Sequence, residues 1–144
     1  YMLCKLAESA MTQETWTDLW TRTPKNVYVW TIEHIFPEGE NIPQSWVDMI
    51  ADGDMELAKK HLNEFTHKIG NLTITGYNST LGNKSFLEKR DRQSKDGKRF
   101  IGYKNGLEIN NEIAKLDAWT IDDIKRRSDS LIRQLMEMFN FPSA

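Results

Sequence analysis

The sequence predicts an α+β domain that is mainly helical, with a short antiparallel hairpin surrounded by helices. Apolar residues recur at helical spacing through most of the 144 residues, whereas residues 27–32 and 72–75 are rich in β-branched and aromatic side chains, as strands are. The length fits one compact domain, which makes repeat arrays a poor interpretation. No apolar run approaches the roughly 18 residues that a membrane-spanning helix needs, so we expect a soluble, cytoplasmic domain.

The elements are expected in a definite order along the chain. Residues 2–10 and 12–20 have helical patterns, and the strand that starts at residue 27 ends at Pro37. Residues 45–51 and 54–65 form two helices, each preceded by a capping residue, so 44–66 is interpreted as a helical insertion between two strands. Residues 72–75 then pair with 32–36. Helices follow at 81–94, 108–117 and 120–139.

Charge is unevenly distributed, although the formal net charge is only −2. Residues 33–64 carry eight acidic side chains against two lysines, so this segment is not suited to binding phosphate. Residues 84–104 carry eight basic side chains against three acidic ones. Such a stretch can neutralise the phosphates of a polyanion, or it can be an ordinary solvated surface.

The residues able to bind a metal are few. The single cysteine, Cys4, allows neither an internal disulfide nor a four-thiolate zinc site, so any metal must use oxygen and imidazole ligands. His61 and His67 fall on different faces of a helix, and we interpret both as structural or surface residues. His34 differs because it follows Glu33 at a strand end, where its side chain can project over a loop.

Three motifs combine around His34. They are Glu-His-Ile-Phe-Pro at 33–37, Gly-Asn-Leu-Thr at 70–73 leading to Asn78, and the Asn-Lys pair at 83–84 that opens a basic segment. Together they give strand, strand and helix, with His, Asn and Asn at the junctions. This order resembles the HNH, or His-Me finger, nucleases, whose ββα unit holds one divalent metal and the scissile phosphate.

The wider chain resembles more closely the C-terminal nuclease domain shared by GmrSD-type modification-dependent restriction enzymes and SspE-type phosphorothioate-sensing enzymes. This match rests on Glu-His-Ile-x-Pro, Gly-Asn-Leu-Thr, Asn-x4-Asn-Lys-x4-Lys and a late Trp-Thr-x3-Ile-x2-Arg-x3-Leu, across about residues 30–131. It implies a single nuclease domain over 1–144 with a ββα-metal core at about 30–94 and C-terminal helical support at 108–140. It also implies that the chain is the C-terminal part of a larger protein.

The resemblance further implies roles for individual residues. His34 would be the general base that takes a proton from the attacking water, and Asn71 would hold the loop that bears it. Glu33 would be an acidic metal ligand, completed by Asn78 or, because the interval after Asn71 is short, by Asn83.

The basic segment would supply the contacts to DNA. Lysines act as point charges that position a phosphate backbone without reading bases. The candidate residues are Lys84, Lys89, Arg90 and Arg92.

A hard cation would suit the implied ligands. Mg²⁺ prefers oxygen donors and keeps several waters, so we expect Mg²⁺, with Mn²⁺ as the alternative, and no structural zinc. An imidazole with a pKa near 6.5 is substantially neutral at pH 7 and can accept a proton. The expected partners are DNA and an N-terminal sensor or nucleotide-hydrolysing domain or subunit. A homo-oligomer would supply a second active site for double-strand cleavage.

Three functions compete. The leading hypothesis is a metal-dependent DNA endonuclease or nicking domain of a bacterial anti-phage or modification-dependent restriction system. The alternative is a non-catalytic nucleic-acid-binding module that uses the basic 84–104 region. A third is a helical protein-interaction module, for which the acidic 33–64 segment is the only support.

Overall fold

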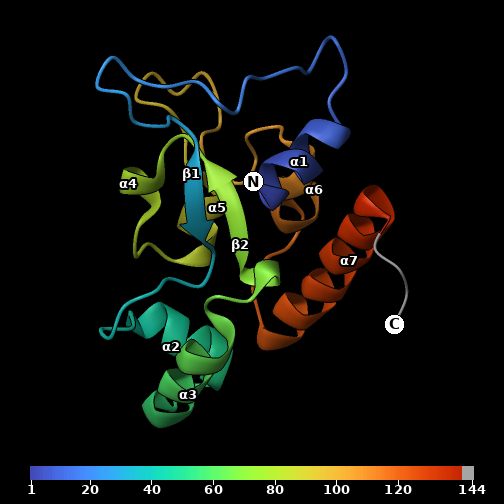
Figure 1. Ribbon diagram of the computed structural model, residues 1–144. Helices are drawn as coiled ribbons and strands as arrows, with labels where there is room; N and C mark the ends of the chain where they lie inside the picture. The colour runs from blue at the N-terminus through green and yellow to red at the C-terminus, as the bar shows by residue number, and fades with distance from the viewer. Residues whose placement is uncertain (141–144) are drawn as a thin grey trace.

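A computed structural model describes residues 1–140 of the chain. Figure 1 shows a two-stranded hairpin in the middle of the molecule with helices on several sides of it. Seven α-helices and one 3-10 helix accompany the two strands within the described residues. The predicted class, α+β and mainly helical, is therefore confirmed.

The hairpin consists of β1 (Thr31–His34) and β2 (Leu72–Thr75), paired antiparallel. In the register Ile32 lies opposite Ile74 and His34 lies opposite Leu72. The predicted pairing of residues 32–36 with 72–75 is thus confirmed in its main part. The backbone N–H of Ile35 continues the contact by donating to the carbonyl of Asn71. His34 is consequently fixed at the end of a paired strand.

The helical insertion between the strands is also confirmed. It consists of α2 (Gln44–Ala51) and α3 (Met55–Phe65), which pack against each other beyond one end of the hairpin (Figure 1). The side chain of Asp54 accepts from the N–H of Leu57 and so caps α3, as an N-cap aspartate does. A 3-10 helix, η1 (Ile69–Asn71), leads from this insertion into β2.

The remaining helices cover the hairpin on two sides. α4 (Asn78–Leu81) contacts β1, while α1 (Met2–Ser9) contacts β2, α6 (Glu108–Ala114) and α7 (Ile121–Phe139). α7 also packs closely against η1, because Gly70 has no side chain: a Cβ there would lie 2.1 Å from the carbonyl oxygen of Ile124. The long last helix therefore fixes the position of residue 71.

Two apolar clusters hold these elements together. One joins the insertion to the segment after β1 and to α7, and its largest members are Phe36, Trp46, Phe65, Phe86, Tyr103 and Trp119. The other lies between α1, β2 and α7, and includes Leu3, Leu6, Ile74, Leu131 and Leu135. The segment that carries His34 is anchored in the first cluster through the fully buried Ile35 and Phe36.

Three expected elements differ from the structure. Residues 12–20 form turns in place of a helix, since Thr and Asp side chains bond to nearby N–H groups: Thr15 accepts from Thr12, and Asp18 accepts from Trp20. The first strand begins at Thr31, later than expected. The expected helix at 81–94 is interrupted by Gly82, which has a positive φ of 43°.

A new helix starts just after this interruption. The N-cap of α5 (Phe86–Asp91) is Ser85, whose side chain forms a capping box with Glu88. Among residues 1–140, no helix combines the length and apolar character needed to cross a bilayer.

Candidate active site

The end of β1 places two neighbouring side chains in opposite environments. Consecutive residues of a strand point to opposite faces, so Glu33 points inward and is buried, whereas the side chain of His34 keeps 17% of its surface exposed. The buried Ile35 and Phe36 hold the next residues in the core. The imidazole of His34 is therefore fixed at its base and open at its edge.

A second histidine and a carboxylate face this imidazole. His67 follows α3, and its Nδ1 lies 3.1 Å from Nε2 of His34, with the two rings edge to face. Glu38 follows β1, and its Oε2 lies 3.8 Å from the same Nε2. The three potential ligand atoms all lie within 4.8 Å of one another, close enough to hold a metal ion.

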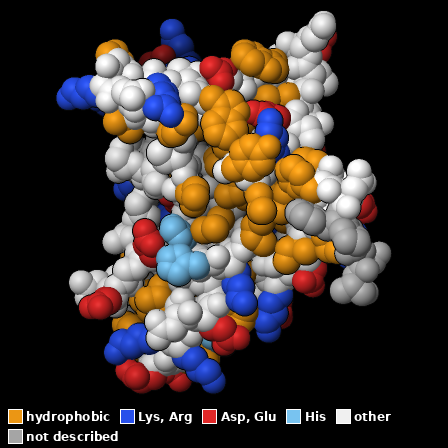
Figure 2. Space-filling view, viewed as in Figure 1, with side chains coloured by type: hydrophobic (Ala, Val, Ile, Leu, Met, Phe, Trp, Pro, Cys, Tyr) orange, Lys and Arg blue, Asp and Glu red, His pale blue; other side chains and the backbone are white. Residues whose placement is uncertain are grey.

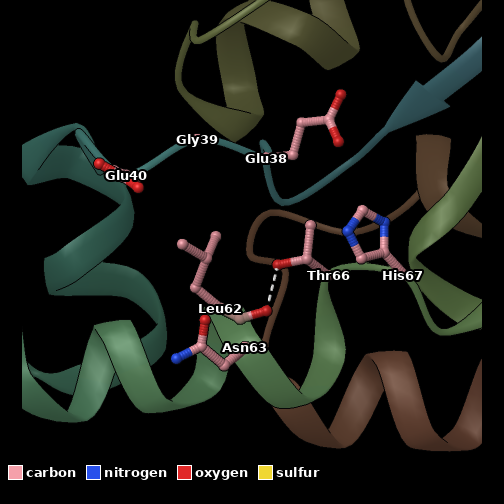
Figure 3. A pocket seen from close by; sticks show the side chains of 7 residues that line it. All are labelled: Glu38, Gly39, Glu40, Leu62, Asn63, Thr66 and His67. Atoms are coloured by element: carbon pink, nitrogen blue, oxygen red, sulfur yellow. Dashed lines mark hydrogen bonds between the residues drawn. The ribbon is translucent and has the colours of Figure 1, made fainter.

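Figure 3 shows Glu38 and His67 on neighbouring segments that border one hollow. This hollow has a volume of about 360 Å³ and is also lined by Gly39, Glu40 and Thr66. In Figure 2 the histidine side chains on this face lie beside a patch of hydrophobic side chains. Glu38 and His67, the two partners of Nε2 of His34, thus border a hollow that is open to solvent.

The electrostatics favour a neutral His34. Partial burial lowers its pKa, Glu38 raises it, and His67 and Lys89 lower it further, so that the pKa lies below the ordinary 6.5. At neutral pH the ring therefore has one protonated and one unprotonated nitrogen. Its contacts use Nε2, and no hydrogen bond to Nδ1 is made by any residue between 1 and 140. In the tautomer that carries its proton on Nε2, the lone pair of Nδ1 has no partner among residues 1–140.

A second hollow lies on another side of His34. It has a volume of about 310 Å³, and Glu38, Asn78 and Asn83 are among the residues that line it together with His34. Asn78 opens α4, and its Nδ2 donates to the carbonyl of Ile32 over 2.7 Å, so its amide oxygen is left for another partner. The structure brings both candidate asparagines to the same hollow as the histidine.

The carboxylate of Glu33, which the sequence suggests as a metal ligand, has two partners inside the protein. Its Oε1 accepts from Nζ of Lys89 over 2.7 Å and from the hydroxyl of Tyr103 over 3.3 Å. Burial raises the pKa of Glu33, and the contacts with Lys89 and Tyr103 oppose this shift. The role of Glu33 as a metal ligand stays a prediction. Glu33 and Glu38 both line the second hollow, but the carboxylate of Glu33 is paired with Lys89, whereas Glu38 leaves 63% of its side chain exposed.

Lys89, a predicted DNA contact, lies in the interior as well. Its side chain is fully buried, and besides Glu33 its Nζ donates to the carbonyls of His34 and Ile35 over 2.8 and 3.2 Å. Burial lowers the pKa of Lys89, and Glu33 opposes the shift. The ammonium is therefore not accessible to a phosphate, and it ties α5 to the backbone that carries His34.

Asn71 lies where it can hold the segment after β1. Its Oδ1 accepts from the N–H of Phe36 over 2.8 Å and from Nε1 of Trp119 over 3.1 Å. Its Nδ2 donates to the carbonyls of Phe36 and Thr66, both over 2.9 Å. One fully buried amide thus links the segment that bears His34 to the segment that bears His67.

The basic candidates separate into two groups. Arg90 is held by ion pairs with Asp91 and Asp117, at 2.7 and 2.6 Å, and donates to the carbonyl of Leu116. Arg92 is exposed and Lys84 is half-buried, and neither side chain forms an ion pair within the described part of the chain. Only these two remain accessible among the four predicted DNA contacts.

Sequence reasoning missed Glu38 and His67. The signal for Glu38 is its position four residues after His34, just past the loop-forming Pro37. His67 gives no comparable signal, because 33 residues separate it from His34. Only the pairing of β1 with β2 brings the two imidazoles together.

A comparison with protein families gives one result. The family described as "GmrSD restriction endonucleases, C-terminal domain" matches residues 1–134. Neither a curated protein nor a solved structure matches the chain.

Proposed function

The chain belongs to the family of GmrSD restriction endonuclease C-terminal domains, and from this premise we propose that it hydrolyses DNA phosphodiester bonds with His34 as general base. The resemblance stated from the sequence is thereby confirmed at the level of the family. The family supports a nuclease domain of a restriction system acting on DNA. The base, the metal and the finger-type core formed by β1, β2 and the following helices are our proposal.

The observation that carries the proposal is the state of His34. Its pKa is lowered, and Nε2 is occupied by the contact with Nδ1 of His67, so the tautomer with its proton on Nε2 leaves the Nδ1 lone pair for water. His34 takes a proton from the water, the water oxygen bonds to phosphorus, and the bond to the leaving oxygen breaks. A proton from solvent then neutralises the leaving oxygen.

The residues around the second hollow fit a divalent cation. Glu38 offers a carboxylate, and Asn78 and Asn83 offer amide oxygens, which are the hard donors that Mg²⁺ prefers and that Mn²⁺ also accepts. When bound, such an ion would stabilise the negative charge that develops on the phosphate and on the leaving oxygen. Glu38 here takes the part that the sequence assigned to Glu33.

Other residues would position the reaction. Asn71 keeps the backbone after His34 in place through Phe36, and a base displaced by about 1 Å costs on the order of a hundredfold in rate. Of the four predicted DNA contacts, Lys84 and Arg92 are the ones accessible to DNA phosphates. Because the family consists of C-terminal domains, we propose that a preceding sensor or nucleotide-hydrolysing domain selects the DNA and controls cleavage.

A plasmid assay tests this function. Supercoiled plasmid is incubated with the protein in Mg²⁺ or Mn²⁺, with a chelator control and the His34→Ala variant. His61→Ala is the matched control, since that ring contacts the carbonyl of Ile50 in the insertion. Open circles that require both metal and His34 support the proposal. A plasmid that is bound but never cut supports the binding module, and cleavage retained by His34→Ala contradicts the role of the base.

A further inference from the structure

Two sets of potential metal ligands meet at Glu38 and His34. The oxygen set lies around the hollow with Asn78 and Asn83. The other set is rich in nitrogen and consists of Nε2 of His34, Nδ1 of His67 and Oε2 of Glu38. His67 belongs to this second set alone, and the proposed hydrolysis does not use it as a ligand.

The spacing of the nitrogen-rich set fits one ion. Ligand bonds of about 2.0–2.2 Å to nitrogen and oxygen place two ligands of the same ion about 3–4 Å apart. Nε2 of His34 lies 3.1 Å from Nδ1 of His67 and 3.8 Å from Oε2 of Glu38. An ion could therefore replace the proton that the two imidazoles share, with little movement of the backbone.

The fold holds these three residues in place before any ion binds. Asn71 binds Phe36 on the segment that carries His34 and Glu38, and it binds the carbonyl of Thr66, next to His67. The hydroxyl of Thr66 donates to the carbonyl of Leu62, the bond drawn in Figure 3, which ties this residue to the end of α3. Both sides of the cluster thus depend on buried contacts.

The chemistry of the donors selects the class of ion. Two imidazoles with one carboxylate and an open position form a ligand set used by zinc enzymes. Imidazole suits Zn²⁺ and other later transition ions, whereas Mg²⁺ prefers oxygen ligands and gives up its waters reluctantly. The nitrogen-rich set should therefore discriminate against the ion that supports hydrolysis.

We propose that His34, Glu38 and His67 form a second cation site, selective for transition ions such as Zn²⁺, whose occupation inactivates the nuclease. Coordination uses the lone pair of Nε2 of His34, so the ring proton resides on Nδ1. No lone pair then remains on the ring to accept a proton from water. The inactivation rests on the proposed function of His34, whereas the binding site does not.

Metal titration tests the site directly. Isothermal titration calorimetry with Zn²⁺ is compared for the wild type, His67→Ala, Glu38→Gln and the control His61→Ala. We expect one Zn²⁺ per chain, an affinity at least about tenfold lower in His67→Ala and in Glu38→Gln, and no change in His61→Ala. Bound Co²⁺ should give visible absorption bands that disappear in His67→Ala. Equal Zn²⁺ affinity in the wild type and His67→Ala would overturn the site.

A second measurement tests the inactivation. Zn²⁺ added to the Mg²⁺-dependent plasmid reaction should inhibit the wild type and His61→Ala, and inhibition of His67→Ala should need at least about tenfold more Zn²⁺. If Zn²⁺ itself supports cleavage and this cleavage requires His67, the inactivation is overturned. If no metal supports cleavage, the proposed nuclease function fails, while the calorimetry still decides whether the site exists.

Discussion

The two carboxylates on either side of His34 have opposite surroundings. Glu33 precedes the histidine in β1, points into the interior and pairs with Lys89. Glu38 follows it by four residues, lies past Pro37, and leaves 63% of its side chain exposed beside the imidazole. Both residues line the second hollow, but the adjacent one is paired in the interior, whereas the more distant one keeps its carboxylate exposed. Strand alternation turns Glu33 inward, and the loop after Pro37 leaves Glu38 exposed.

The buried side also supports the exposed side. Lys89 donates to the carbonyls of His34 and Ile35 as well as to Glu33, and Tyr103 donates to the same carboxylate. These bonds fix the backbone at the point where the imidazole leaves the strand. The buried contacts on the inner face thus hold the backbone from which the imidazole projects on the outer face.

The largest effect on stability is expected from Glu33→Gln, which we compare with the same change at Glu38. Glu33→Gln leaves the ammonium of Lys89 buried without its counter-charge, which should lower the free energy of unfolding by about 3–5 kcal/mol. Glu38→Gln changes an exposed group and should alter it by no more than about 0.5 kcal/mol. Urea denaturation followed by tryptophan fluorescence measures both values.

A double variant separates the charge from the packing. Glu33→Leu combined with Lys89→Met leaves no unpaired charge inside, so it should be more stable than Glu33→Gln. If Glu33→Gln and Glu38→Gln unfold at the same urea concentration, the two faces do not differ as described.

The second largest effect, on both stability and cleavage, is expected at Asn71. Its buried amide bonds to Phe36, after His34, and to Thr66, before His67. Asn71→Ala leaves the buried N–H groups of Phe36 and Trp119 without their acceptor, and each such group costs about 1–3 kcal/mol. Cleavage should fall about a hundredfold because the segment behind His34 is released. Mn²⁺ affinity should fall much less than cleavage, because Asn71 does not contact Asn78 or Asn83. Plasmid cleavage and Mn²⁺ binding are measured at a temperature where circular dichroism shows the variant folded.

Asn41→Ala is the matched control for this variant, since Asn41 is exposed and lines neither of the two hollows. It should retain both stability and cleavage. Full activity of a folded Asn71→Ala protein would remove the positioning role.

A smaller effect is expected at the asparagines of the second hollow. Removal of an amide oxygen that holds the ion should lower Mn²⁺ affinity about tenfold. Titration of Asn78→Ala and Asn83→Ala, monitored by the electron paramagnetic resonance signal of free Mn²⁺, shows which of the two contributes. Wild-type affinity in both variants would exclude both asparagines as ligands.

Most of the fold follows from local patterns in the sequence. The apolar spacing of α7, the capped helices of the insertion and the β-branched residues of β2 each suffice to predict their elements. Residues 12–20 were predicted wrongly, because their apolar spacing competes with Thr and Asp side chains that favour turns. The interruption at Gly82 depends on a positive backbone φ, which hydrophobic periodicity does not indicate.

The candidate site could be predicted only in part. His34, Asn71, Asn78 and Asn83 stand at junctions of elements, where motifs indicate them, and the structure places them around one strand end. The burial of Lys89 could not be foreseen, since its partner lies 56 residues away. His67 contacts His34 only because the antiparallel register closes a chain of 33 residues.

The smallest effect is expected from the basic residues outside the two faces of β1. Arg92→Glu and Lys84→Ala should weaken binding to a DNA duplex uniformly across sequences, and each should reduce the slope of log affinity against log salt by about 1, as loss of one phosphate contact does. Arg90→Glu should instead lower stability, because it breaks the ion pairs with Asp91 and Asp117. Fluorescence anisotropy over a range of salt concentrations measures the slope, and urea denaturation measures the stability of Arg90→Glu. An unchanged slope in both Arg92→Glu and Lys84→Ala would place the DNA elsewhere on the molecule and separate the candidate site from its proposed backbone contacts.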